Sequence, residues 1–131
     1  MTHYEAMKAA AFASSSGGGE VDNLFTSEVE IGTIDANGVN TDNANRLRTK
    51  DFITLEAGTY ALVYTTNLKA VAFRYAPDGT FIERSNSGSF SGIPLRFDAL
   101  EGQKFRFIFS KDSQPPAMSP DDLHNPMLLK D

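Results

Sequence analysis

Apolar and polar residues alternate with a period of two along most of the chain after residue 27. The clearest example lies at residues 104–110, where Phe105, Phe107 and Phe109 alternate with lysine, arginine, isoleucine and serine. Strict alternation predicts a strand with one face in the core and the other toward solvent. Weaker alternation predicts further strands at residues 28–33, 60–64, 69–76, 80–84 and 93–97.

Turn signals separate these predicted strands. Asp35-Ala36-Asn37-Gly38 ends the first strand, Pro77-Asp78-Gly79 joins two others as a hairpin, and residues 40–45 and 85–92 are expected to be loops. Ser119, followed by Pro120 and two aspartates, predicts a helix of about one turn, which Pro126 ends. Six or seven short strands without a long helix predict an all-β fold, an antiparallel β-sandwich or jelly roll.

The first 27 residues follow a different pattern. Tyr4, Met7, Ala11 and Phe12 recur at spacings of three and four, which is typical of a short helix with one apolar face. Three serines and three glycines at residues 14–19 have the composition of a flexible tether. Because about ten residues do not hold a helix in water unaided, this arm either packs on its own domain, anchors the chain to a partner, or is frayed. We expect an anchoring arm at residues 1–27 and one β-sandwich domain at residues 28–131.

Composition excludes several classes of function. The 131 residues contain no cysteine and no tryptophan, two histidines, and 17 acidic against 12 basic side chains, for a net charge of -5. Without cysteine the chain has no disulfide framework and no thiolate metal site. A net negative charge argues against nucleic acid as the main partner, and no apolar run approaches the roughly 20 residues that span a bilayer.

Catalytic and metal-binding signals are weak. His3 and His124 lie far apart in the sequence, no motif for a nucleophilic hydrolase is present, and most acidic residues fall in predicted turns. We therefore expect no enzymatic activity, although two acids facing one cleft would indicate a small hydrolase. The Asx-rich segment 35–43 lacks the spacing of an EF-hand, so a turn is favoured over a structural calcium site. No cofactor and no metal are predicted.

Arginines and aromatic residues are the candidates for ligand binding. Arg46 and Arg48 flank Leu47, so both point to the same side of an extended strand. With other residues they could form a cationic face that holds carboxylates, phosphates or sugar hydroxyls. The candidates are Arg46, Arg48, Arg74, Tyr75, Phe90 and Arg106. The alternative, which we favour, is that the arginines pair with acids such as Asp51, Glu83 and Asp98.

Six sequence pieces occur in an order that resembles a known group of proteins. They are Gly-x-Ile-Asp-x-Asn-Gly at 32–38, Asn-Arg-Leu-Arg-Thr-Lys-Asp-Phe-Ile at 45–53, Glu-Ala-Gly-Thr-Tyr at 56–60, Val-Ala-Phe-Arg-Tyr at 71–75, Lys-Phe-Arg-Phe-Ile-Phe at 104–109 and Ser-Pro-Asp-Asp-Leu at 119–123. Together they resemble small β-sandwich modules of phage tail, baseplate and fibre proteins and of some bacterial surface proteins. The resemblance covers about 90 residues of the chain.

This resemblance implies a non-enzymatic virion protein of the tail, baseplate, fibre or capsid decoration. Its N-terminal arm would dock on other virion proteins, and the sandwich would be displayed, with adhesion to a host-surface polysaccharide as a further role. The alternative is a stand-alone carbohydrate-binding module at the cell surface or outside the cell. A homotrimer is an alternative to a monomer because fibre and decoration proteins are often trimers.

Overall fold

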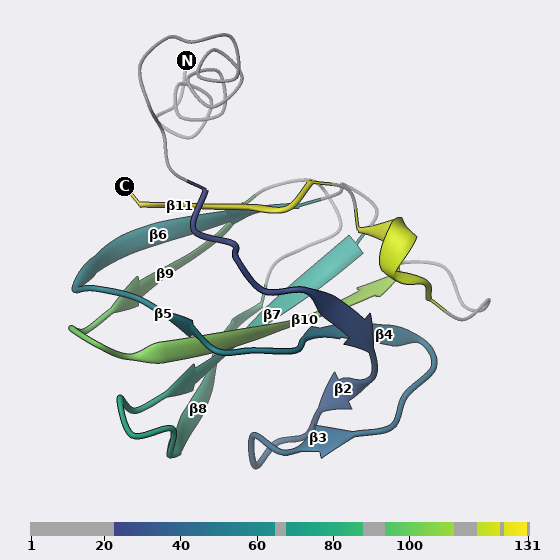
Figure 1. Ribbon diagram of the computed structural model, residues 1–131, viewed down its shortest axis with the longest axis horizontal. Coiled ribbons are helices and arrows are strands. Elements are labelled where there is room, and N and C mark those ends of the chain that lie inside the picture. The colour runs from purple at the N-terminus through teal and green to yellow at the C-terminus, as the bar shows by residue number, and fades with distance from the viewer. Residues whose placement is uncertain (1–22, 65–67, 88–93, 112–117, 124, 131) are drawn as a thin grey trace, which may run out of the picture.

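The structure, a computed structural model, describes residues 23–64, 68–87, 94–111, 118–123 and 125–130 (Figure 1). Within these residues the fold is all-β, and every strand pair is antiparallel. The one helix in the described part of the chain is a single 3₁₀ turn, η1 (Pro120–Asp122). The predicted all-β, antiparallel class is thus confirmed.

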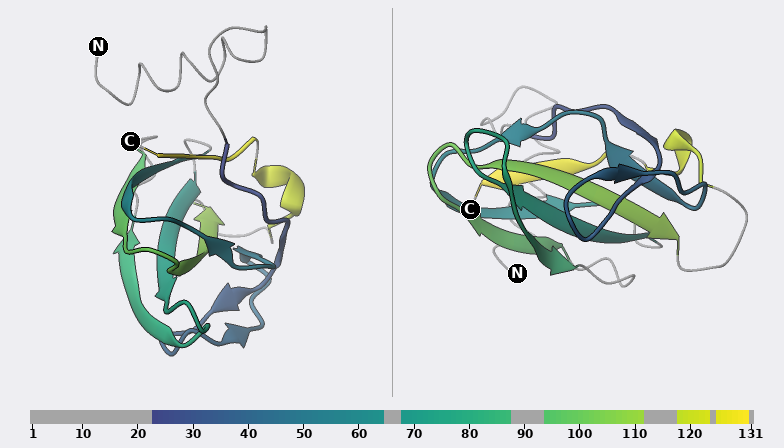
Figure 2. Two further views of the ribbon diagram at one scale, coloured as in Figure 1. Left: turned by 60° about the vertical axis from the view of Figure 1, so that its left-hand side comes forward. Right: turned by 90° about the horizontal axis from the view of Figure 1, so that it is seen from below.

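Two main sheets and one hairpin make up the fold (Figures 1 and 2). The larger sheet has the order β1 (Val29–Ile31), β4 (Arg46–Thr49), β10 (Lys104–Lys111), β7 (Leu68–Tyr75), β8 (Phe81–Ser87), and β5 (Ile53–Thr54) also pairs with β10. The smaller sheet has the order β11 (Met127–Lys130), β6 (Gly58–Val63), β9 (Leu95–Ala99). Strands β2 (Thr33–Ile34) and β3 (Asn40–Thr41) form the separate hairpin.

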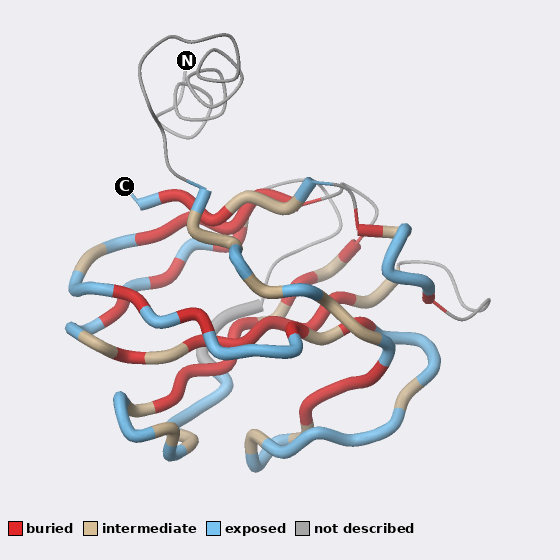
Figure 3. The backbone as a smooth tube through the Cα atoms, in the orientation of Figure 1, coloured by how far each residue is buried: buried red, intermediate tan, exposed pale blue. Residues whose placement is uncertain are grey.

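The two main sheets bury side chains in one shared core. Phe105, Phe107 and Phe109 of β10 are fully buried there, together with Tyr60 and Leu62 of β6. Figure 3 shows buried residues along the strands of both sheets and exposed residues mainly in the turns between them. The alternation at residues 104–110 therefore predicted the inward face of β10 correctly, and burial of such large side chains is the main stabilising term of the fold.

The outer face of β10 differs from the expectation that it contacts solvent. Arg106 and Ile108 are 7% and 4% exposed, because the β2–β3 hairpin lies over this part of the larger sheet. Ile34 of the hairpin joins Phe73, Tyr75 and Ile108 in a second, smaller apolar cluster. We call this group the outer cluster; it buries a sheet face that the sequence pattern assigned to water.

The tip of the hairpin is a tight turn formed by the predicted Asp-Ala-Asn-Gly sequence. The Asp35 carboxylate accepts hydrogen bonds from the amides of Asn37 at 2.8 Å and Val39 at 3.1 Å. Gly38 has a φ of +79°, which glycine adopts without steric cost. The turn prediction is confirmed, whereas Asn40–Thr41, expected to be loop, forms strand β3 because the turn folds it back onto β2.

Two other local expectations need correction at the ends of elements. Residues 85–87 continue strand β8 rather than beginning a loop, because Asn86 and Ser87 pair with β7 beyond a bulge. The C-terminal strand β11 has no counterpart in the sequence prediction, since its four residues follow a proline and show no alternation. The predicted turn of helix before it is confirmed: Ser119 caps η1, and Asp122 completes the capping box.

The described chain begins with a segment that is tied to β11. Asn23 accepts hydrogen bonds through its side-chain oxygen from the amides of Phe25 at 3.0 Å and Leu128 at 2.9 Å, and its amide group donates to the Pro126 carbonyl at 3.1 Å. Leu24 donates its backbone N–H to the Leu128 carbonyl at 2.8 Å, and both Leu24 and Phe25 pack against the core. Residues 23–25 therefore contact the core of the two sheets, whereas the predicted anchoring residues Tyr4, Met7, Ala11 and Phe12 lie outside the described residues.

Candidate functional site

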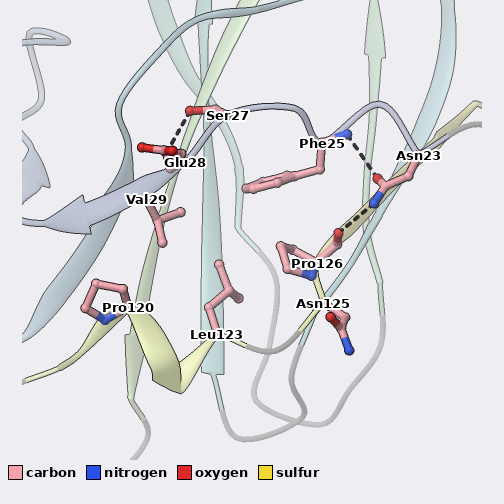
Figure 4. A pocket seen from close by; sticks show the side chains of 9 residues that line it. All are labelled: Asn23, Phe25, Ser27, Glu28, Val29, Pro120, Leu123, Asn125 and Pro126. Carbon is pink, nitrogen blue, oxygen red and sulfur yellow. Dashed lines mark hydrogen bonds between the residues drawn. The ribbon is translucent and has the colours of Figure 1, made fainter.

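An open groove of about 510 Å³ lies where the N-terminal segment meets the chain around η1 (Figure 4). Two parts of the sequence that are almost 100 residues apart form its walls: residues 23–29 on one side, and residues 120–126 on the other. Its lining consists of Asn23, Phe25, Ser27, Glu28, Val29, Pro120, Leu123, Asn125 and Pro126. The hydrogen bonds of Asn23 and the capping box at Ser119 hold the two walls in place.

The groove has an apolar floor and a polar rim. Figure 4 shows Phe25, Val29 and Leu123 pointing into the space between the two walls. Glu28 is the only ionisable side chain among the described lining residues, and its carboxylate pairs with the ammonium group of Lys50 at 3.2 Å. Apolar side chains with hydrogen-bonding groups around them are suited to binding a segment of polypeptide.

Arg48 and Arg106 hold the β2–β3 hairpin against the larger sheet. Arg48 forms an ion pair with Glu30 at 2.8 Å and donates to the carbonyls of Thr33 and Thr41, both at 3.1 Å. Arg106 donates to the Thr49 carbonyl from two of its nitrogens and to the Asn40 side-chain oxygen at 2.6 Å. Burial lowers the pKa of the Arg106 guanidinium. These two arginines therefore stabilise the fold through bonds within the chain.

Arg74 lies on the opposite face of the larger sheet, toward the core. Its guanidinium donates to the side-chain oxygen of Gln103 at 2.6 Å and stands 5.0 Å from the centre of the Phe105 ring. It also forms ion pairs with Glu83 at 3.2 Å and Asp98 at 3.4 Å. Glu83 and Asp98, two of the acids expected to pair with the arginines, are thus partners of Arg74. The four candidate arginines do not lie on one face of the sheet.

The aromatic candidates are placed as follows. Tyr75 belongs to the outer cluster, is 3% exposed, and donates its hydroxyl to the Gly38 carbonyl at 2.9 Å. Burial raises the pKa of the Tyr75 hydroxyl, and the ring contacts Phe52 and Phe81 at centroid distances of 4.8 and 5.4 Å. Phe90 lies outside the described residues. The sugar-stacking role of both residues stays a prediction.

A second pocket, of about 160 Å³, lies on the outer face of the larger sheet. Its lining residues are Arg46, Lys69, Val71, Arg84, Ile108 and Ser110. Of these, the sequence pattern singled out Arg46 alone as a binding residue. Lys69 and Arg84 occur on different strands, so only the strand register shows that they meet Arg46. We call this site the basic pocket.

In the described ranges no group of three or more histidine, cysteine, aspartate or glutamate side chains is arranged to hold a metal ion. No helix in the same ranges has the length and apolar character needed to cross a membrane.

Comparison with known proteins gives no match. No family model matches the chain, and neither a curated protein nor a solved structure matches it.

Proposed function

We propose that this protein is a non-enzymatic accessory component of a phage-type virion, built as an arm and a displayed jelly-roll sandwich. The N-terminal arm docks on another virion protein, and the sandwich projects from it. The sequence resemblance over residues 32–123 supports the virion assignment, and the antiparallel all-β architecture is compatible with a jelly roll. Proteins of this kind act by binding and display.

The observation that carries the proposal is the way the chain joins the sandwich. Residues 23 and 24 are fixed to the C-terminal part of the fold by three hydrogen bonds with Pro126 and Leu128, directly beside the apolar groove. The first described residues are therefore attached to the body of the fold, which gives the predicted arm a fixed point of attachment. If the ten residues between Phe12 and Asn23 form the tether that their composition predicts, they span on the order of 17 Å, so a partner bound to the arm would lie within reach of the groove.

The groove is accordingly proposed to receive an apolar segment of the same virion partner that binds the arm. Phe25, Val29 and Leu123 supply the apolar contacts, and Asn23 and Asn125 supply hydrogen-bonding groups at the rim. Two linked contacts of modest strength bind more tightly than either alone, because the first contact raises the effective concentration of the second. An arm and a neighbouring groove thus give a small domain a firm attachment.

The test changes one face of the arm in the full-length protein. Ala11→Asp places a charge among Tyr4, Met7 and Phe12, whereas Ala6→Asp places the same charge on the opposite side of the predicted helix. We expect Ala11→Asp to remove the protein from purified particles and Ala6→Asp to leave its incorporation unchanged. Equal incorporation of both variants, measured by immunoblot of particles sedimented on a gradient, contradicts docking through the arm.

Adhesion to a surface glycan is the second part of the proposal. It rests on the part of the outer face of the larger sheet that carries the basic pocket, where Arg46 and Arg84 are exposed. A glycan array probed with the full-length protein tests it directly: selective binding supports adhesion, and silence across the array leaves virion decoration as the function. Strong glycan binding by a protein that is absent from particles would favour the alternative of a stand-alone carbohydrate-binding module.

A further inference from the structure

The basic pocket spans four neighbouring strands of the larger sheet. Arg46 of β4 is opposite Ser110 of β10, which in turn is opposite Lys69 of β7. Val71 and Ile108 form the next pair on the same face and line the pocket with apolar surface. Arg84 of β8 completes the lining, so four separate parts of the sequence converge on a space of about 160 Å³.

The charge of this pocket sets it apart from the rest of the molecule. Three of its six described lining residues are cations, and none of the six is an acid. The side chains of Lys69 and Arg84 form no ion pair or hydrogen bond with the part of the chain that the structure describes. The Arg46 side chain donates one long hydrogen bond there, at 3.5 Å, to the Thr33 hydroxyl. The whole chain nevertheless carries 17 acids against 12 basic residues, so acidic partners are plentiful.

Several other cations of the described chain have acidic partners. Five of them form ion pairs, and these are Arg48, Lys50, Arg74, Lys111 and Lys130. Three cations that converge without an acid repel one another, and an anion placed between them removes this repulsion. Convergence of unpaired cations in one hollow is therefore a feature that a bound anion explains.

We propose that the basic pocket binds one oxyanion group, a phosphate, sulfate or carboxylate. Arg46 and Arg84 can each offer the forked pair of N–H donors that fits such a group, Lys69 contributes a compact charge, and the Ser110 hydroxyl can donate a further hydrogen bond. The volume accommodates a single anionic group and not a chain of sugars. The group is either a free inorganic ion or the acidic substituent of a polysaccharide whose remaining rings lie outside the pocket.

This site is independent of docking through the arm, since it lies on another surface and uses none of the groove residues. It would also operate in a module that never joins a particle. If the arm variants do not behave as expected in the particle assay, the proposal for the basic pocket is unaffected. A negative result for anion binding likewise leaves the proposal for the arm unaffected.

The experiment is a titration of the full-length, isotope-labelled protein followed by NMR at about 10 mM ionic strength, where charge interactions are weakly screened. The probes are inorganic phosphate, inorganic sulfate, an oligogalacturonate and a neutral maltooligosaccharide. We expect saturable shifts of the Lys69, Arg84 and Ser110 amides with the anionic probes and none with the neutral one. Tighter binding of oligogalacturonate than of the inorganic ions assigns the site to a polysaccharide substituent, and the opposite order assigns it to a free ion.

The variant Lys69→Gln/Arg84→Gln should weaken binding of the anionic probes by at least about tenfold, because it removes two of the three charges. Lys104→Gln is the control, because it removes a lysine from the same strand as Ser110 but at the other end, outside the pocket. It should change affinity by less than about twofold, apart from the general effect of net charge. Shifts that do not saturate, or equal weakening by Lys104→Gln and by the double variant, overturn the proposal.

Discussion

Arg106 provides the sharpest test of how this fold is held together. Its guanidinium is 7% exposed and binds the carbonyl of Thr49 in β4 and the side chain of Asn40 in β3. One side chain thus ties the β2–β3 hairpin to the larger sheet. Arg106→Ala removes these bonds and leaves the Thr49 carbonyl without its two side-chain donors.

The expected loss can be worked out from these contacts. Each hydrogen bond between a charged donor and its acceptor contributes about 1.5–3 kcal/mol net, so the two acceptors account for about 3–6 kcal/mol. The substitution also recovers part of the cost of burying a charge, which is several kcal/mol for a poorly solvated ion. We therefore expect Arg106→Ala to lower the free energy of unfolding by about 2–4 kcal/mol.

Urea denaturation followed by circular dichroism measures this loss. With a slope of about 2 kcal/mol per molar urea for a chain of this size, the midpoint should fall by about 1–2 M. Arg84→Ala is the matched control, because the Arg84 side chain is exposed on the same sheet and forms no hydrogen bond or ion pair with a described residue. Its midpoint should stay within the error expected for surface changes, about 0.5 kcal/mol.

Hydrogen exchange shows where the structure opens in the Arg106 variant. The amides of Asp35 and Gly38, which bond within the hairpin turn, should lose protection before the amides of β6 do. If Arg106→Ala stays within about 0.5 kcal/mol of the wild type and keeps the hairpin amides protected, the side chain does not hold the hairpin. That result would return Arg106 to the ligand-binding role that its position in the sequence first indicated.

Two further predictions concern a turn and an ion pair. Gly38→Ala should lower the free energy of unfolding by about 1–3 kcal/mol, because φ is +79° there and an added Cβ would lie 2.4 Å from the Phe81 ring. Thermal denaturation measures the change, and a loss below about 0.5 kcal/mol would contradict the prediction. The hydrogen bond from the Lys130 ammonium, at 2.7 Å, lowers the pKa of the Glu56 carboxyl, so Lys130→Met should raise that pKa toward its usual value in an NMR titration. In the wild type this ion pair stabilises the fold at pH values above the unfolded-state pKa of Glu56. The stabilisation is lost as the pH falls through the lowered folded-state pKa. An unchanged Glu56 pKa in Lys130→Met would refute the role of Lys130.

Local patterns predicted the parts of the fold that depend on neighbouring residues. The alternation of phenylalanines identified the buried face of β10, and the Asp-Ala-Asn-Gly sequence identified the hairpin turn. The capping sequence at Ser119 identified η1. Each of these features is determined within a few residues, by strand geometry, turn conformation or a cap, and is therefore visible in the sequence.

Features that depend on strand register could not be predicted in this way. The outer face of β10 is buried because a hairpin about 70 residues earlier in the sequence covers it, and no local pattern indicates that contact. Strand β11 forms because β6 offers it a partner across more than 60 residues. The two walls of the groove likewise come from opposite ends of the described chain.

The roles of the candidate arginines could likewise be predicted only in part from the sequence. The sequence places Arg46 and Arg48 on one side of a strand, which the structure bears out, since both point to the outer face of the larger sheet. It cannot show that Arg48 finds Glu30 and two hairpin carbonyls while Arg46 remains beside Lys69. Whether an arginine has a structural role or can bind a ligand depends on the acceptors that the fold places beside it. Its spacing along the strand does not decide this.

This separation leads to opposite expectations for two groups of cations on one sheet face. Arg48 and Arg106 lie under the hairpin and are bonded within the chain, so replacing them should lower stability. Lys69, Arg84 and Arg46 line one pocket as like charges that repel one another, so replacing Lys69 or Arg84 should leave stability unchanged or raise it, while anion binding falls. If loss of binding and loss of stability always occurred together across these four variants, the outer face would have a single structural role and the basic pocket would have no ligand of its own.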